Sequence, residues 1–142
     1  MQAEDKKITY LQMLQEPISR MSTASAIFKG FAATIVTGIT AITFSEVHII
    51  ILALSFLPIL SFAALDIYYL RIERKYRFIY EQVRRGNQKI TFSLDINLSQ
   101  PEVRLAKARI RDCIKSPSIL LFYLPMLGIL IVVFILKLNN II

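Results

Sequence analysis

Three long apolar stretches alternate with charged segments along the chain. Ser116–Leu136 has 21 residues without a charge, Val47–Leu65 carries only a histidine near its start, and Gly30–Ser45 is a shorter third stretch. A helix needs about 20 residues to cross the apolar core of a bilayer. These lengths favour membrane spans over helices buried inside a soluble protein. The pattern therefore predicts an all-α membrane protein with transmembrane helices at about 27–45, 48–70 and 117–137.

The first two predicted spans are joined by a very short link, Ser45–His48. Because backbone groups in lipid must bond to one another, so short a link implies a tight helical hairpin. Apolar residues at helical spacing before the hairpin predict an amphipathic helix that Pro17 kinks or divides into two. We therefore expect a single membrane domain over 1–142, composed of a cytoplasmic N-terminal helix (1–25), the hairpin (26–70), a basic cytoplasmic segment (71–115) and the third span (116–137).

The segment between the second and third spans begins and ends with helical signals. The second span continues as a helix to about Arg85, because Gly86 is a typical residue just beyond a helix end. Further on, Ser99 and Glu102 have the spacing of a capping box, with a proline between them in the first turn. This pattern predicts a second cytoplasmic helix from Gln100 to Lys115.

The distribution of charge gives the chain an orientation. The protein has 17 Lys and Arg against 10 Asp and Glu, a net charge of +7, although 55% of its residues are hydrophobic and its mean hydropathy is +0.54. Twelve of the cations fall between Arg71 and Lys115, none lies between the first two spans, and only Lys137 follows the third. Since positive charge stays inside, we expect a cytoplasmic N-terminus and an external C-terminus.

The composition offers little support for catalysis or metal binding. One Cys and one His exclude a disulfide framework and a clustered metal site, and the first 25 residues lack the apolar core of a secretory signal peptide. His48 has only Glu46 near it in sequence, and a lone Cys113 is more often a packing residue than a nucleophile. We therefore expect no enzyme, no metal and no cofactor.

The first predicted span has an unusual surface of small and polar residues. Small side chains let membrane helices approach closely, and threonine can bond across the contact. Packing within the hairpin, an oligomer interface and a wet pore lining are all compatible with this pattern. The candidate residues for helix packing or pore lining are Gly30, Thr34, Thr37, Gly38 and Ala41.

Asp66 is the only acid inside a predicted span. In an antiparallel hairpin, Lys29 lies at a similar depth on the neighbouring helix. An unpaired charge at that depth is costly, so we expect an intramembrane ion pair between Lys29 and Asp66. Its role is structural or, alternatively, that of a gating switch.

A segment rich in arginine and aromatic residues follows the second span. Directly below a span, such a segment usually attracts anionic headgroups. Arginine mixed with aromatic residues can also bind nucleotides or single strands. The candidate lipid- or ligand-binding residues are Arg71, Arg74, Lys75, Arg77, Arg84, Arg85, Arg104, Lys107 and Arg111.

Self-association is expected from the pattern of the same segment. Gln88–Ile96 alternates apolar and polar residues, which predicts a strand-like stretch (88–96) that needs a partner. The helix before it carries an apolar stripe beyond the membrane, and three spans are too few to enclose an aqueous path. We therefore expect a homo-oligomer, with subunit or inter-helix contacts at Ile72, Tyr76, Ile79 and Phe92.

Five short blocks carry a resemblance. They are Tyr10–Gln15 (Tyr-Leu-Gln-Met-Leu-Gln), Ile18–Met21 (Ile-Ser-Arg-Met), Ser25 with Lys29-Gly30, Asp66–Arg74 (Asp-Ile-Tyr-Tyr-Leu-Arg-Ile-Glu-Arg) and Phe92–Asp95 (Phe-Ser-Leu-Asp). They resemble a family of small bacterial multi-spanning membrane proteins of unknown function. The resemblance covers roughly residues 10–95, and Asp66–Arg74 is its most specific block. Members usually have Trp where this chain has Phe31.

That family is similar in layout to small membrane effectors of bacterial anti-phage defence. The resemblance implies an effector or subunit in the bacterial inner membrane, which oligomerises and perturbs the membrane when its basic cytoplasmic segment is engaged. The alternatives are a non-toxic anchor or scaffold for a soluble partner, and a sensor that binds a nucleotide signal. The expected partners are therefore a bilayer with anionic headgroups, further copies of the chain, and a soluble protein or nucleotide at the cytoplasmic face.

Overall fold

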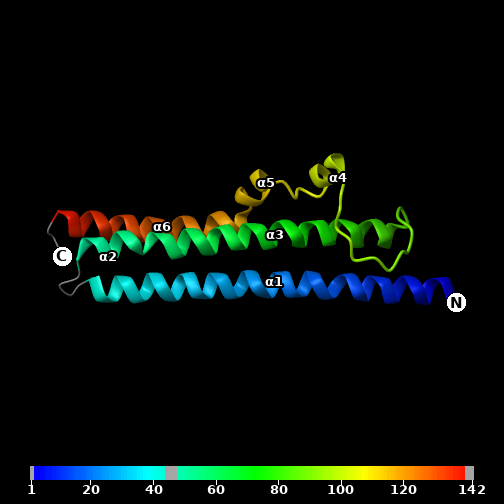
Figure 1. Cartoon of the computed structure of the whole chain (residues 1–142), viewed down its shortest axis with the longest axis horizontal. Helices are drawn as coiled ribbons and strands as arrows, with labels where there is room; N and C mark the ends of the chain where they lie inside the picture. The colour runs from blue at the N-terminus through cyan, green and yellow to red at the C-terminus, as the bar shows by residue number, and fades with distance from the viewer. Residues whose placement is uncertain (1, 44–47, 140–142) are drawn as a thin grey trace. The chain divides into compact units, whose positions relative to one another are not determined.

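The computed structural model describes residues 2–43 and 48–139, and these residues form helices and connecting segments without any strand (Figure 1). The predicted hairpin link is therefore outside the described residues except for His48. The helices are α1 (Gln2–Thr43), α2 (Ile49–Leu54), α3 (Phe56–Arg85), α4 (Gln100–Leu105), α5 (Ile110–Ile114) and α6 (Pro117–Leu138).

Three helical stretches are long and apolar enough to cross a membrane: Ala3–Thr43, Ile49–Arg85 and Gln100–Leu138. The predicted all-α class is thereby confirmed, with three helices that could span a membrane. Much of their apolar surface is exposed, which a soluble protein would have to cover. Exposed residues of this kind include Ile27, Phe31, Ile50, Leu54, Leu57, Leu60, Leu121, Leu124 and Val132. The structure is consistent with a multi-pass membrane protein.

The first helix is longer than the sequence suggests. The alternative in which Pro17 divides this segment into two helices is wrong, because α1 is continuous over its 42 residues with Pro17 inside it (Figure 1). Proline removes only one backbone hydrogen bond, the one to the carbonyl four residues earlier, and the neighbouring turns maintain the helix. At 1.5 Å per residue α1 is about 60 Å long, roughly twice the thickness of a bilayer core.

The second stretch is almost one helix, as expected. Only Ser55 separates α2 from α3, and its hydroxyl donates to the Leu52 carbonyl. The Gly86 stop signal is confirmed: Gly86 has a φ of 79°, and the amides of Gly86 and Asn87 donate to the carbonyls of Val83 and Gln82. This paired bonding beyond a helix end is a Schellman motif, which favours glycine because of the positive φ.

The described chain forms two compact units. The first, here called the polar unit, comprises residues 1–25 and 68–113, and the second, the apolar unit, comprises 26–67 and 114–142. In the apolar unit the Phe62 ring stacks on those of Phe28 and Phe31, with centroids 6.3 and 6.0 Å away. The Phe56 and Phe134 rings meet edge to face at 6.2 Å. Aromatic contacts thus help to hold α1, α3 and α6 together within this unit.

The core of the polar unit lies between the N-terminal part of α1 and the C-terminal part of α3. Tyr10 and Leu14 of α1 pack against Ile79 and Val83 of α3, and all four are buried. The Lys7 ammonium donates to the Arg84 carbonyl over 2.9 Å. This carbonyl is at the C-terminal end of α3, where the negative end of the helix dipole stabilises a cation. The apolar stripe that extends α3 is therefore covered by the chain's own first helix.

The strand-like stretch over 88–96 is wrong. Short polar side chains there bond to the backbone two residues further on: Thr91 accepts from the Ser93 amide, and Ser93 accepts from the Asp95 amide. These local turns compete with a sheet ladder. Phe92 has a φ of 53°, a left-handed conformation that interrupts the alternation of an extended strand. The alternating apolar residues instead bring Ile90 and Ile96 onto the core of the polar unit.

The single helix over 100–115 is also wrong in part. The capping box is confirmed, because the Glu102 carboxylate accepts from both the amide and the hydroxyl of Ser99 at 2.7 and 2.6 Å. The helix then stops at Leu105, since Lys107 has a φ of 51° and its amide and that of Ala108 close a second Schellman motif. The sequence has no glycine at this helix end that would have indicated it.

We expect Tyr10→Phe to loosen the connecting segment of the polar unit. The Tyr10 hydroxyl is buried and donates to the Ser93 carbonyl over 2.7 Å. Its loss should cost about 1–2 kcal/mol and increase amide exchange and proteolysis between Lys89 and Asn97. Tyr80→Phe is the matched control, because Tyr80 packs on the same core without a hydroxyl bond to a described residue. Equal exchange in both variants would contradict the assigned role.

Candidate functional site

The apolar unit contains one ion pair between described residues. Lys29 of α1 and Asp66 of α3 lie with Nζ and Oδ2 2.5 Å apart, so the pair expected from the sequence is present. The Asp66 side chain is fully buried and that of Lys29 is 18% exposed. Burying either charge alone would cost several kcal/mol, so the pair neutralises what the surrounding apolar residues cannot solvate.

The apolar unit contains two more buried polar atoms near this ion pair. The second carboxylate oxygen of Asp66 and the hydroxyl of Tyr123 on α6 are both buried, and the two side chains interact. The Asp66 charge is close enough to act on the Tyr123 hydroxyl. Lys29, Asp66 and Tyr123 thus form a polar cluster, to which α1, α3 and α6 each contribute one side chain. Tyr123 could not be predicted from the sequence, because a tyrosine in a span is an ordinary residue.

The small-residue face of the first span is open in the described chain. Gly30, Thr34, Thr37, Gly38 and Ala41 are all exposed. A Cβ added at Gly30 or Gly38 would meet no atom within 4 Å, so neither glycine allows a close approach within one chain. Thr34 donates to its own helix at the Gly30 carbonyl over 2.9 Å. The hairpin therefore does not use this face among the described residues.

Most arginines of the predicted basic segment have partners inside the polar unit. Arg77 pairs with Glu73 at 2.7 Å, and both Arg84 and Arg85 pair with Glu81 at 2.7 Å. The guanidinium groups remain largely exposed, so the two pairs with Glu81 add little stability, whereas the Arg77 pair neutralises the buried carboxylate of Glu73. They do reduce the net charge of that surface, and an anionic ligand would meet less charge there than the sequence indicates.

Arg71 and Arg74 have a different role, because they bind backbone. Arg71 Nε donates to the Ala108 carbonyl over 3.1 Å, and Arg74 Nη1 donates to the carbonyls of Lys107 and Asp112 over 2.7 and 3.0 Å. The carbonyls of Lys107 and Ala108 lie in the connection between α4 and α5, where no helix satisfies them, and that of Asp112 lies in the short helix α5. The two arginines therefore hold the α4–α5 segment against α3.

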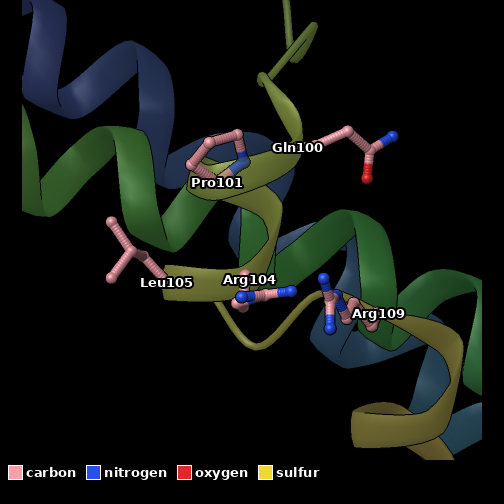
Figure 2. A pocket seen from close by; sticks show the side chains of 5 residues that line it. All are labelled: Gln100, Pro101, Arg104, Leu105 and Arg109. Atoms are coloured by element: carbon pink, nitrogen blue, oxygen red, sulfur yellow. The ribbon is translucent and has the colours of Figure 1, made fainter.

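The remaining cations of the segment lie on its surface. Arg104, Lys107, Arg111 and Arg109 are exposed, and Lys75 is partly exposed. Figure 2 shows a hollow lined by Gln100, Pro101, Arg104, Leu105 and Arg109. Arg109 is the functional candidate that sequence reasoning missed, although its charge and its position before the third span could have indicated it.

The residues expected at oligomer contacts meet the rest of their own chain. Ile79 is buried in the core of the polar unit and Tyr76 packs against it, with its hydroxyl donating to the Leu94 carbonyl over 3.2 Å. The Phe92 ring lies 5.6 Å from that of Tyr10. Ile72 is half-buried. For three of the four, the observed contact is therefore within the polar unit.

The described residues contain no group of His, Cys, Asp and Glu that could hold a metal ion. Cys113 is fully buried, with its sulfur 4.0 Å from the Lys107 carbonyl, and so packs as an apolar residue. Glu46 lies outside the described residues. No protein-family model, curated protein or solved structure matches the chain.

We expect the Lys29–Asp66 pair to behave as a unit. Asp66→Leu leaves a cation in an apolar environment and should destabilise the protein by about 3 kcal/mol, whereas Lys29→Met combined with Asp66→Leu should cost clearly less. Thermal unfolding in detergent, followed by circular dichroism, measures both. If the double variant is as unstable as the sum of the single variants, the two charges are not coupled.

We expect Arg74→Gln to release the α4–α5 segment. The variant loses two charge-assisted bonds to backbone carbonyls, which should cost about 1–2 kcal/mol and raise amide exchange over residues 106–113. Arg85→Gln is the matched control, since it removes the same charge from a largely exposed pair with Glu81, which keeps Arg84 as a partner, and it should change stability very little. Similar exchange in both variants would show that the clamp contributes nothing.

Proposed function

We propose that the protein is a membrane effector, or an effector subunit, of bacterial antiviral defence. In this proposal it sits in the inner membrane with its N-terminus in the cytoplasm and its C-terminus outside. It oligomerises and perturbs the membrane when its polar unit is engaged. Support comes from the three helices of spanning length, the charge asymmetry and the layout of small membrane effectors.

The exposed small-residue face of α1 is the observation that carries the proposal. Three helices from one chain cannot enclose a path for water or ions, so a membrane-perturbing activity requires several copies. Gly30, Thr34 and Gly38 fall at successive helical turns and offer little surface to lipid, but they let a second helix come close. Thr37 and Ala41 extend this face toward the end of the described part of α1. The same face could line a wet path between copies.

Membrane potential during phage challenge tests the proposal directly. Cells that carry the protein in its defence setting should lose potential, measured with a voltage-sensitive dye, before phage progeny appear. Overproduction of the chain alone should impair growth. Full protection with intact potential would exclude the effector role, and harmless overproduction together with capture of a soluble protein would favour an anchor or scaffold.

Gly38→Leu should weaken self-association by about tenfold or more, a change of roughly 1.4 kcal/mol, because it places a large side chain on the open face of α1. Mass measurement in nanodiscs reports the oligomer, and the dye assay reports the activity. Gly128→Leu is the matched control, because a Cβ at Gly128 of α6 also meets no atom within 4 Å. A monomeric wild-type protein, or equal effects of both variants, would contradict assembly through α1.

A further inference from the structure

Arg104 and Arg109 share a hollow on the polar unit. The hollow has a volume of about 360 Å³, and no acidic residue lines it. This volume is at the lower end of the ~300–1,000 Å³ typical of small-molecule sites. In Figure 2 the two guanidinium groups lie close together on one side of the hollow. Neither group has a hydrogen bond or an ion pair with a described residue.

Two like charges that face one hollow repel each other, and an anion between them removes that cost. Planar guanidinium groups match the geometry of phosphate oxygens and can bind them bidentately. Gln100 also lines the hollow and carries a neutral side chain. A phosphate group is thus the chemistry that this hollow fits.

A second hollow of the same volume shows why the first is distinctive. It is lined by Arg74, Arg77, Phe78, Glu81, Leu105, Ala106 and Lys107. There Arg74 is bound to carbonyls, Arg77 is paired with Glu73, and Glu81 supplies a negative charge. Its two arginines are therefore already bound or paired, and Lys107 is the remaining cation of its lining. In the first hollow both guanidinium groups are available.

Apolar neighbours indicate which source of phosphate is favoured. Leu105, which lines the hollow, is 72% exposed, and Ile110, next to Arg109, is 54% exposed. Arg109 is also eight residues before Pro117, the first residue of α6, which limits their separation to about 28 Å of extended chain. Exposed apolar side chains next to cations, close to a span, are the pattern of an interfacial segment.

We propose that Arg104 and Arg109 bind the phosphate of an anionic lipid headgroup, while Leu105 and Ile110 contact the acyl chains at the inner face of the membrane. This site gives the basic segment a defined lipid ligand. It rests on the proposed function only in that the polar unit faces the cytoplasmic leaflet.

Lipid binding by the full-length protein in detergent tests the site. Native mass spectrometry compares a short-chain phosphatidylglycerol with the phosphatidylcholine of the same chain length. The wild type should prefer the anionic lipid on the order of tenfold or more, the size expected for two cations near an anionic headgroup. Arg104→Gln combined with Arg109→Gln should reduce that preference to about twofold or less.

The matched control is Arg84→Gln combined with Arg85→Gln, which removes the same net charge from arginines paired with Glu81. It should keep the preference. Equal losses in both double variants would overturn the site in favour of diffuse attraction, and so would a wild type without preference. A parallel titration uses inorganic phosphate and ATP. Binding of either at least as tight as that of the lipid would overturn the lipid assignment.

The lipid and potential measurements separate this site from the proposed function. An anionic preference that depends on Arg104 and Arg109, in a protein that leaves the membrane potential intact, would support the site and remove the effector role. Depolarisation by a variant that has lost the lipid preference would show that the effector activity does not depend on this site. A wild type that depolarises cells but shows no preference would overturn the site alone. Circular dichroism of each variant verifies that helix content is unchanged.

Discussion

In the interior of a bilayer every backbone N–H and C=O group must find its partner within the protein, because no water is there to bond it. This constraint explains why α1 is continuous through the first predicted span and why only Ser55 interrupts the second stretch. Within the apolar unit the backbone is thereby satisfied by the helices themselves. The few charges that remain must be satisfied by each other, as Lys29 and Asp66 are.

The polar unit meets the same requirement by a different route. Its connecting segments are not helical, so their carbonyls need donors from elsewhere. Long side chains on the two helices supply them: Tyr10 and Tyr76 reach the carbonyls of Ser93 and Leu94, and Arg74 reaches that of Lys107 between α4 and α5. Residues that a sequence presents as an aromatic and basic surface thus serve largely as donors to the backbone.

Whether a feature could be predicted from the sequence depends on how far apart in the chain its interacting residues are. The spans, the Gly86 stop and the Ser99–Glu102 capping box depend on neighbouring residues, and each is predicted correctly. The Lys29–Asp66 pair could be predicted because an antiparallel hairpin places residues of similar membrane depth next to each other. By contrast, the left-handed conformations of Phe92 and Lys107 leave no mark in the sequence, since neither position has a glycine. The false strand and the overlong second cytoplasmic helix both follow from these two residues.

The same reasoning changes which surfaces are available to partners. The stripe at Tyr76 and Ile79 is predicted to lie at subunit or inter-helix contacts, and the N-terminal part of α1 covers it. The face formed by Gly30, Thr34 and Gly38 was most simply explained by hairpin packing, yet it is open. The surface left without a partner is therefore not the apolar stripe of α3 but the small-residue face in the first predicted span. Only a neighbour in the membrane could cover that face. The same holds for charge. The number of cations in the sequence overstates the positive charge available to an anion, because helical arginines are bound to carbonyls and carboxylates.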